Sequence, residues 1–271
     1  MVNQMDSTFL KWAGGKNWFV RQCADLLPAD YNRYIDPFLG GGSVFFYLEP
    51  EISVLSDINE ELITTYRAIQ TNWREVRRQL RIHANRHNEQ YYYLVRNSDP
   101  RADSTIAARM IYLNRTCFNG IYRVNRQGRF NVPIGSHINV ILPTDQFERR
   151  SEILQGATLF CRDFEETIDE AEEGDLLFCD PPYAVLEEQR FVGYTRNLFD
   201  WNCQERLAHS LYRAQTRGVK IVLTNVNHPA VRALYNDDRF EIVEVNRFCS
   251  ISGRAGGRQQ YSEMVVRANI D

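Results

Sequence analysis

Several features that mark common protein classes are missing from this sequence. It has no run of about 18 or more apolar residues, which excludes an ordinary membrane-spanning helix. Residues 1–8 are polar and show no signal-peptide pattern. The six cysteines are scattered and form no C-x-x-C pair, so neither a zinc site nor a disulfide framework is indicated. We therefore expect a cytoplasmic protein that has free thiols and needs neither a membrane nor a metal.

An excess of positive charge and two nucleotide-binding signatures are missing as well. The formal net charge is −3, which does not mark a nucleic-acid binder, although the placement of charges matters more than their sum. The segment Gly14-Gly15-Lys16 is not a Walker loop, because Leu10 and Asn17 stand where that loop has a glycine and a hydroxyl residue. The motif G-x-G-x-x-G is absent, which argues against a nicotinamide oxidoreductase. The length of 271 residues suits one large domain, or one domain with a sizeable insertion.

The stretch that carries the most chemistry is residues 176–183, in which four apolar residues run into Asp180, Pro181, Pro182 and Tyr183. The short apolar run is typical of a buried parallel strand, and the prolines stop it because they donate no backbone hydrogen bond. Open α/β sheets place their ligands at such strand ends. A carboxylate, carbonyls and a flat ring together suit a planar substrate with an exocyclic amino group. The alternative is an ordinary strand that ends in a Pro-Pro turn.

Residues 34–43 predict a strand, a glycine loop and the start of a helix over about 43–48. A second strand over 52–55 leads to Asp57, which lies 21 positions after Asp36, about where a ribose-binding acid belongs. The double glycine at 14–15 precedes an apolar helix over 18–27 and would let a ligand approach the backbone. Two alternatives stay open: Asp57 caps a helix in a tight turn, and Lys16 is a solvated side chain on a plain loop.

The pattern is helical from Glu60 to about Asn114 and predicts an inserted helical subdomain. Residues 104–144 contain no acid, and 122–132 predict a hairpin that turns at Gln127-Gly128. A basic hairpin can enter a DNA groove, and Phe118 beside Asn119 offers an aromatic wedge next to a polar reader. A solvated basic face is the alternative. The arginines of the acid-free stretch are Arg109, Arg115, Arg123, Arg126 and Arg129.

The rest of the chain resumes an α/β pattern. Strands are expected at 157–161, 219–224, 240–245 and 263–267, and helices at 165–175 and 202–216. Residues 184–201 lack periodicity and predict a loop over the site. Residues 250–260 are rich in Gly, Ser and Arg and predict a mobile loop near a polyanion.

Taken in order, these stretches resemble the DNA adenine methylase (Dam) family, the S-adenosylmethionine-dependent N6-adenine methyltransferases. The similarity covers most of the chain, and the combination is specific although each motif alone is not. The matching stretches are Lys11-Trp12-Ala13-Gly14-Gly15-Lys16, then Asp36-Pro37-Phe38-Leu39-Gly40-Gly41-Gly42-Ser43-Val44-Phe45, Asp57, Asn114-Arg115 through Gly135, and Asp180-Pro181-Pro182-Tyr183.

The resemblance implies a Rossmann-like methyltransferase sheet with one antiparallel edge strand. It also implies an inserted helical target-recognition subdomain that carries a β-hairpin, and methylation of adenine in duplex DNA at GATC. On this basis the catalytic domain is expected to comprise residues 1–58 and 145–271, and the recognition subdomain residues 59–144. We expect a monomer or a weak dimer, with S-adenosylmethionine as cofactor, duplex DNA as partner and no metal.

The residues that the resemblance and the chemistry single out fall into three groups. The expected catalytic residues are Asp180, Pro181, Pro182 and Tyr183. The expected cofactor contacts are Trp12, Ala13, Gly14, Lys16, Asp36, Phe38, Gly40, Asp57, Asp163, Phe164 and Asp180. The expected DNA contacts are Arg115, Phe118, Asn119, Arg123, Arg126, Arg129 and Pro133.

The expected mechanism is base flipping followed by direct in-line transfer. Hydrogen bonds from the adenine amino group to the Asp180 carboxylate and the Pro181 carbonyl would free the nitrogen lone pair for attack. Two further alternatives remain at this point. One keeps the fold but methylates RNA or a protein amide, and the other is a DNA-binding module without activity, against which the intact Asp180–Tyr183 motif argues.

Overall fold

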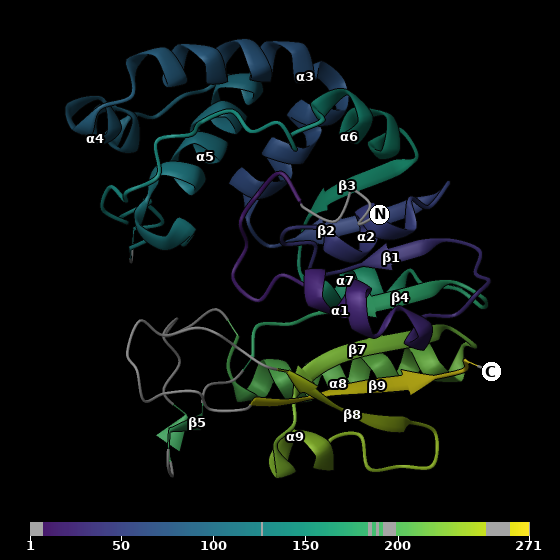
Figure 1. The fold of residues 1–271 in the computed structure, drawn as a ribbon. Coiled ribbons are helices and arrows are strands. Elements are labelled where there is room, and N and C mark those ends of the chain that lie inside the picture. Colours follow the sequence, from purple (N-terminus) through teal and green to yellow (C-terminus); the bar gives the residue numbers. More distant parts are fainter. Residues whose placement is uncertain are drawn as a thin grey trace. The chain divides into compact units, whose positions relative to one another are not determined.

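The computed structural model describes residues 8–125, 127–183, 186–187, 190–191, 199–247 and 261–270. The chain divides into two compact units (Figure 1). The first unit comprises residues 1–24 and 39–161, and the second comprises 25–38 and 162–271. Over the described ranges, no helix is both long enough and apolar enough to span a membrane.

The first unit is mainly helical. Its strands are β2 (Ser53–Asp57) and β3 (Ala157–Cys161), which pair in parallel. A short 3-10 helix, η1 (Ala24–Leu26), lies at the boundary between the units in the chain. The other helical elements are α1 (Asn17–Gln22), α2 (Ser43–Leu48), α3 (Glu60–Arg86), α4 (Glu89–Asn97), α5 (Asp103–Thr116), the 3-10 helix η2 (Phe118–Gly120) and α6 (Phe147–Leu154).

Side-chain caps set where the long helices of the first unit begin. The Asn59 side chain accepts a hydrogen bond from Leu62 N at the start of α3, and the Asn88 side chain accepts one from Tyr91 N at the start of α4. Helix α3 packs against both α5 and α6. The prediction of a helical region after Glu60 is confirmed, and the chain breaks it into α3, α4 and α5.

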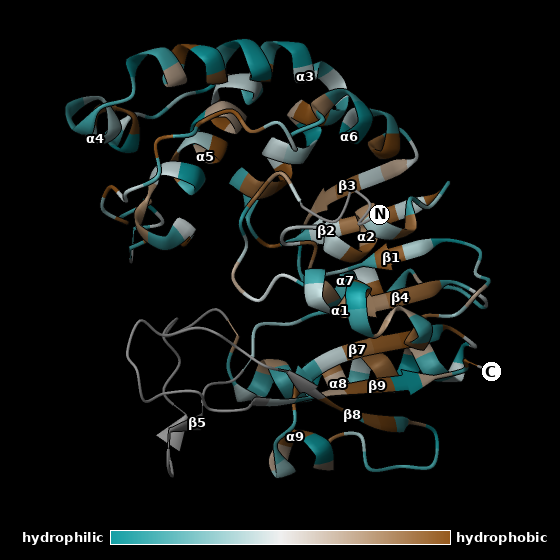
Figure 2. Cartoon of the chain, in the orientation of Figure 1, coloured by the Kyte–Doolittle hydropathy of each residue, from teal (hydrophilic) through white to brown (hydrophobic). Residues whose placement is uncertain are grey.

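The second unit contains a five-element strand order, β1-β4-β7-β9-β8. Strands β1 (Tyr34–Asp36), β4 (Leu176–Cys179) and β7 (Lys220–Val226) run parallel, and β9 (Tyr261–Ala268) is antiparallel to both β7 and β8 (Glu241–Arg247). Figure 2 shows β4, β7 and β9 largely in hydrophobic colours, as expected for strands in the middle of a covered sheet. The other elements are α7 (Phe164–Asp169), β5 (Leu186–Glu187), β6 (Arg190–Phe191), α8 (Trp201–Thr216) and α9 (Pro229–Ala233).

This arrangement positions the site and confirms the predicted α/β class. Because β1 and β4 are parallel neighbours, Asp36 at the end of β1 and Asp180 just after β4 lie at the same edge of the sheet. Strands joined through helices in this way are typical of Rossmann-like folds.

Four sequence expectations need comment. The antiparallel strand was expected at the edge, but β9 is second from the edge, because β8 adds outside it as the other arm of a hairpin-like pair. Part of the expected loop over 184–201 forms the short antiparallel pair β5–β6. The expected loop over 250–260 lies outside the described residues. The compact units also do not follow the expected functional boundaries, so the recognition subdomain over 59–144 stays a prediction.

Candidate active site

The Asp180–Tyr183 turn leaves the end of β4, whose residues Leu176–Cys179 are all buried. Strands β4 and β7 pair with Cys179 opposite Leu223, so Thr224 lies beside Asp180. The Thr224 hydroxyl donates to Oδ1 of Asp180 over 2.9 Å. A carboxylate at the end of a central strand is therefore held by the neighbouring strand, as the sequence pattern requires.

Tyr183 is fixed at its hydroxyl by a buried acid. Its hydroxyl donates to Oε2 of Glu263 over 2.7 Å, and Glu263 on β9 is only 5% exposed. Burial raises the pKa of Tyr183 well above its ordinary value, and the charges of Asp180 and Glu263 raise it further. Tyr183 is therefore a neutral phenol that presents its ring from a tethered position.

The Pro182 carbonyl is held from helix α8. The Gln204 side chain donates to it over 3.3 Å, and the Asn225 side chain donates in turn to Oε1 of Gln204 over 3.1 Å. Gln204 and Asn225 are fully buried. The sequence analysis missed Thr224, Gln204, Asn225 and Glu263, although an acid within the apolar run of β9 was a visible signal of a buried polar contact.

Asp36 shapes the turn after β1. It is 3% exposed, and its two oxygens accept hydrogen bonds from the Tyr34 hydroxyl and from Phe38 N, each over 3.0 Å. Burial, followed by the charge of Asp36, raises the pKa of Tyr34 well above its ordinary value, so the phenol stays a donor. The turn presents the half-buried ring of Phe38, which stacks on buried Phe164 with ring centroids 5.3 Å apart.

Asp163 and Phe164 stand where β3 gives way to α7. The Asp163 side chain caps α7 by accepting from Glu165 N over 3.0 Å. Arg206 of α8 donates to Oδ1 of Asp163 over 2.8 Å and lies 4.9 Å from the ring centroid of Phe164. An arginine that bridges an acid and an aromatic ring fixes both of them at this edge of the second unit.

The glycine loop of the first unit is built around Asp57 and Trp12. Asp57 accepts hydrogen bonds from Gly40 N over 3.1 Å and from Asn59 N over 2.9 Å, and burial raises its pKa. Gly40 has φ +47°, and a Cβ there would lie 2.7 Å from the Trp12 indole. Only glycine fits between the loop and this ring. Asp57 thus belongs to a tight turn, as one alternative held, and its contact with a ligand stays a prediction.

The segment before α1 does not match the alternative of a solvated lysine. Lys16 is 3% exposed and its Nζ donates to Gly14 O over 3.0 Å. Gly14 has φ +80°, and a Cβ there would meet nothing within 4 Å. Ala13 and Gly14 are exposed, so the backbone of this turn is open to a ligand while the lysine below it is enclosed.

The predicted hairpin is a short turn closed by main-chain hydrogen bonds. Val124 pairs with Phe130, Asn131 N donates to Arg123 O over 3.1 Å, and Gly128 has φ +73°. Arg123 and Arg129 are exposed, and Arg123 Nε donates to Oδ1 of Asn131 over 2.9 Å. Arg126 lies outside the described residues.

The expected wedge stands beside this hairpin. Phe118 is 54% exposed, and its backbone N donates to Pro133 O over 2.9 Å. Asn119 is exposed with φ +57°, a left-handed conformation that Asn tolerates better than most residues. Pro133 is exposed as well. A half-exposed aromatic ring therefore stands next to an exposed polar side chain in the first unit.

Arg115 was expected to contact DNA, and the structure places it elsewhere. It is 3% exposed and forms an ion pair with Asp145, while its guanidinium also donates to the carbonyls of Phe9 and Val140. A guanidinium with these partners is a buried structural clamp and has no surface to offer a phosphate. Arg115 therefore leaves the set of DNA-contacting candidates.

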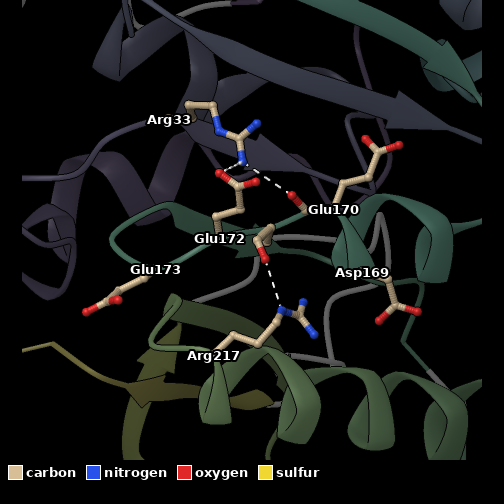
Figure 3. Close-up of a pocket in the computed structure, with 7 residues that line it drawn as sticks. Arg33, Asp169, Glu170, Glu172, Glu173 and Arg217 are labelled. Atoms are coloured by element: carbon tan, nitrogen blue, oxygen red, sulfur yellow. Dashed lines mark hydrogen bonds and ion pairs between the residues drawn. The ribbon is translucent and has the colours of Figure 1, made fainter.

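One hollow of the second unit lies away from this chemistry. It has a volume of about 640 Å3 and is lined by charged residues that include Arg33, Glu170 and Arg217 (Figure 3). Arg33 precedes β1 and Arg217 precedes β7, so the hollow is at the amino ends of parallel strands, whereas Asp36 and Asp180 lie at the carboxyl ends of β1 and β4. Its arginines already bind backbone carbonyls and acids.

Across the described ranges, no group of three or more His, Cys, Asp or Glu side chains could hold a metal.

The chain is similar to proteins of known function. The model of the D12 class N6 adenine-specific DNA methyltransferases matches residues 12–251. The chain belongs to this family. It is similar to the type II methyltransferase M1.LlaDCHI of Lactococcus lactis subsp. cremoris, with 34% identity over 95% of this chain and 94% of that one. It is also similar to the DNA adenine methylases of Vibrio cholerae (33% identity, 95% and 94% covered) and Haemophilus influenzae (32%, 95% and 92%).

The family assignment confirms the resemblance that the motifs indicated. The protein is an adenine-specific DNA methyltransferase, which replaces the RNA, protein-amide and oxidoreductase alternatives. The motif Asp180-Pro181-Pro182-Tyr183 lies within the matched residues and at the carboxyl end of a central strand.

Proposed function

We propose that this methyltransferase uses S-adenosylmethionine to methylate N6 of an adenine flipped out of duplex DNA, at GATC. The observation that carries the proposal is the tethered turn after β4, in which Thr224 holds the Asp180 carboxylate and Glu263 holds the Tyr183 ring. A fixed carboxylate next to a fixed ring suits a base that carries an amino group.

In the first unit, the residues around the glycine loop fit the amino-acid and ribose parts of the cofactor. The exposed backbone of Ala13 and Gly14 leaves room for a ligand, and Trp12 and Gly40 form a wall whose shape depends on glycine. Each carboxylate oxygen has more than one lone-pair site, so Asp57 can accept ribose hydroxyls as well as its backbone donors. Lys16 would support the turn from below.

In the second unit, aromatic and acidic residues fit the adenine part of the cofactor. Phe38 is half-buried and would stack on the ring, with Phe164 packed behind it. Asp163 would accept from an amino group, and Asp36 would hold the turn that presents Phe38. When bound, S-adenosylmethionine supplies a methyl group on a positively charged sulfur that is already activated for transfer.

The chain's own contribution to chemistry is to free a lone pair and orient a base. The N6 lone pair of adenine is delocalised into its ring. Hydrogen bonds from N6–H to the Asp180 carboxylate and the Pro181 carbonyl favour a pyramidal nitrogen whose lone pair points at the acceptor orbital. Orientation and electrostatics of this kind need no covalent enzyme intermediate.

Reaching the turn requires the adenine to leave the base stack. Unstacking and unpairing cost a few kcal/mol, and stacking on Tyr183 would offset about 1–3 kcal/mol of this. On the first unit, Phe118 would fill the gap in the duplex, with Asn119 and Pro133 on the same surface. Arg123 would bind a guanine of GATC, and Arg129 and Arg126 would contact phosphates.

The test is methyl transfer from labelled S-adenosylmethionine to duplexes that contain GATC or carry a single change within it. Transfer restricted to GATC supports the proposed site, and equal transfer to every altered duplex contradicts it. Flipping is measured separately with 2-aminopurine at the target adenine, whose fluorescence should rise on binding. If a duplex is methylated without any such rise, base flipping is contradicted, but the methyl transfer itself is not.

A further inference from the structure

The turn after β4 has few backbone hydrogen-bond donors of its own. Pro181 and Pro182 have no backbone N–H, so the middle of this stretch cannot be anchored by donating to a neighbouring strand. What the two prolines offer their neighbours is carbonyl oxygens, flanked by the side chains of Asp180 and Tyr183. Donors and acceptors that reach in from other elements therefore contribute to the position of the turn.

Three elements of the second unit supply those groups. From α8, the buried Gln204 side chain donates to the Pro182 carbonyl and is itself oriented by Asn225 of β7. From β7, Thr224 donates to Asp180. From β9, buried Glu263 accepts the Tyr183 hydroxyl.

The Glu263 contact is the most informative, because a buried carboxylate is costly unless it has a task. Taking an ion out of water costs several kcal/mol, and Glu263 lies on a strand whose neighbours Met264, Val265 and Val266 are fully buried. An apolar residue would suit this position for folding. Burial raises the pKa of Tyr183 well above its ordinary value, so at neutral pH the phenol stays protonated and keeps donating to Glu263.

We infer that Glu263 and Gln204 are positioning residues for methyl transfer, which set the ring plane of Tyr183 and the Pro182 carbonyl before a base arrives. The inference rests on the proposed role of this turn in holding the flipped adenine. Glu263 acts through the Tyr183 hydroxyl, and Gln204 acts through the turn itself. Neither side chain is required to touch the substrate.

The experiment compares Glu263→Ala with Glu263→Gln, which keeps an acceptor oxygen for the Tyr183 hydroxyl. Single-turnover rates, and the KM values for S-adenosylmethionine and duplex, are measured for each. Since a misplacement of about 1 Å costs roughly a hundredfold, Glu263→Ala should lower the rate by between about tenfold and a hundredfold. Both KM values should stay near those of the wild type, and Glu263→Gln should recover most of the rate.

The matched control is Glu244→Ala. Glu244 on β8 also binds a hydroxyl, that of Ser262 over 2.6 Å, but it is exposed, and because it pairs with Met264 its side chain lies on the opposite face of the strand pair from Glu263. Its loss should leave the methylation rate unchanged.

Gln204→Leu keeps the side-chain size without the donor and should lower the rate in the same way as Glu263→Ala.

Tyr183→Phe tests the tether from its other end and guards against misfolding of the Glu263 variant. It keeps the ring but removes the hydroxyl, so its rate should fall as in Glu263→Ala, and the double variant should be no slower than Tyr183→Phe. A wild-type rate for Glu263→Ala, or equal losses in Glu263→Ala and Glu263→Gln, would overturn the inference. Wild-type protein that methylates DNA without the 2-aminopurine signal would instead overturn the proposed flipping.

Discussion

Aspartates at the ends of β1 and β2 and just after β4 share one residue type but have different partners. Both oxygens of Asp36 accept hydrogen bonds, from the Tyr34 hydroxyl and from Phe38 N, and these bonds stabilise the turn after β1. Asp57 holds the glycine loop through backbone donors. Asp180 is held by a side chain, Thr224. These differences predict different consequences when each carboxylate is removed.

Asp180→Ala should abolish methyl transfer while leaving the fold intact, because the residue stands at a strand end and its loss removes an acceptor for N6–H. The measurement is the single-turnover rate beside a thermal unfolding curve. Asp180→Asn is the matched variant, since it keeps the shape and one acceptor oxygen but loses the charge. If Asp180→Ala kept more than about a tenth of the wild-type rate, a loss of under roughly 1.4 kcal/mol, Asp180 would not be the activating group.

Asp57→Ala should weaken cofactor binding far more than DNA binding. A charged acceptor contributes about 1.5–3 kcal/mol per hydrogen bond, and the glycine loop also loses its anchor at Gly40 N. Calorimetric titration with S-adenosylmethionine measures the effect. Asp36→Asn is a useful comparison, because Asp36 and its neighbour Phe38 belong to the second unit whereas Asp57 belongs to the first. Unchanged cofactor affinity in Asp57→Ala would remove this residue from the binding site.

Arg115 and Arg123 should give opposite results when each is changed to alanine. Arg115→Ala leaves Asp145 buried beside a cavity, and breaking such a pair costs about 3–5 kcal/mol of unfolding free energy. Arg123 is exposed, so Arg123→Ala should change stability by less than about 0.5 kcal/mol but relax the preference at one guanine of GATC. Denaturant unfolding and methylation of singly altered duplexes separate the two. Equal losses on every duplex for Arg123→Ala would reduce that residue to a phosphate contact.

At the scale of elements, a cluster of histidine and tyrosine rings joins α3, α4 and α5. His83 of α3 stacks on Tyr112 of α5, with ring centroids 4.8 Å apart, and its Nδ1 lies 2.9 Å from the Tyr91 hydroxyl of α4. His87 makes a similar contact, 2.9 Å from the Tyr112 hydroxyl. Burial lowers the pKa of His83 to about 4, with a smaller contribution from Arg86. The helices are thus joined by a contact that suits the neutral imidazole.

This pKa predicts a loss of stability in acid. Below pH 6.5 the unfolded chain binds a proton at His83 that the folded chain refuses until about pH 4, so the unfolding free energy falls through that window. The loss due to His83 is at most about 3 kcal/mol. Urea unfolding of the wild type and of His83→Phe, which keeps an aromatic ring, measures it. The variant should lose less stability between these pH values, and parallel curves would contradict the assignment.

Elements were predictable where local pattern and tertiary setting agree. The strand over 157–161 and the helix over 43–48 have the bounds that the sequence indicated, because an apolar run and a glycine loop mark their ends. Helices α6 and α9 were not predicted. Each is short, and α6 depends on packing against α3, a contact between residues far apart in the sequence. Propensity over a few residues does not reveal such support.

At the scale of the whole molecule, the motifs identified the enzyme class and the strand ends that carry its acids. They did not reveal how the acids are held. The contacts of Glu263 with Tyr183 and of Gln204 with Pro182 join β9 and α8 to the turn across 80 and 22 residues, respectively. The prediction for Arg115 failed for a related reason. An arginine can contact DNA or form a buried ion pair, and the residue type alone does not distinguish the two. Its acid, Asp145, is 30 residues away and outside the acid-free stretch.

The closed base of the segment after α5 has a consequence for the role in target recognition that we propose for this segment. Gly135 N donates to Thr116 O over 2.7 Å, and Cys117 pairs with Ile134, so main-chain contacts bring the two ends together whatever side chains lie between them. Lengthening a loop closed in this way costs only about 0.6 kcal/mol for each doubling of its length. In that proposed role the tip over 122–131 should behave as a cassette, so that grafting tips of other lengths between the two closed ends should change the preferred target while the catalytic strands keep their sequence.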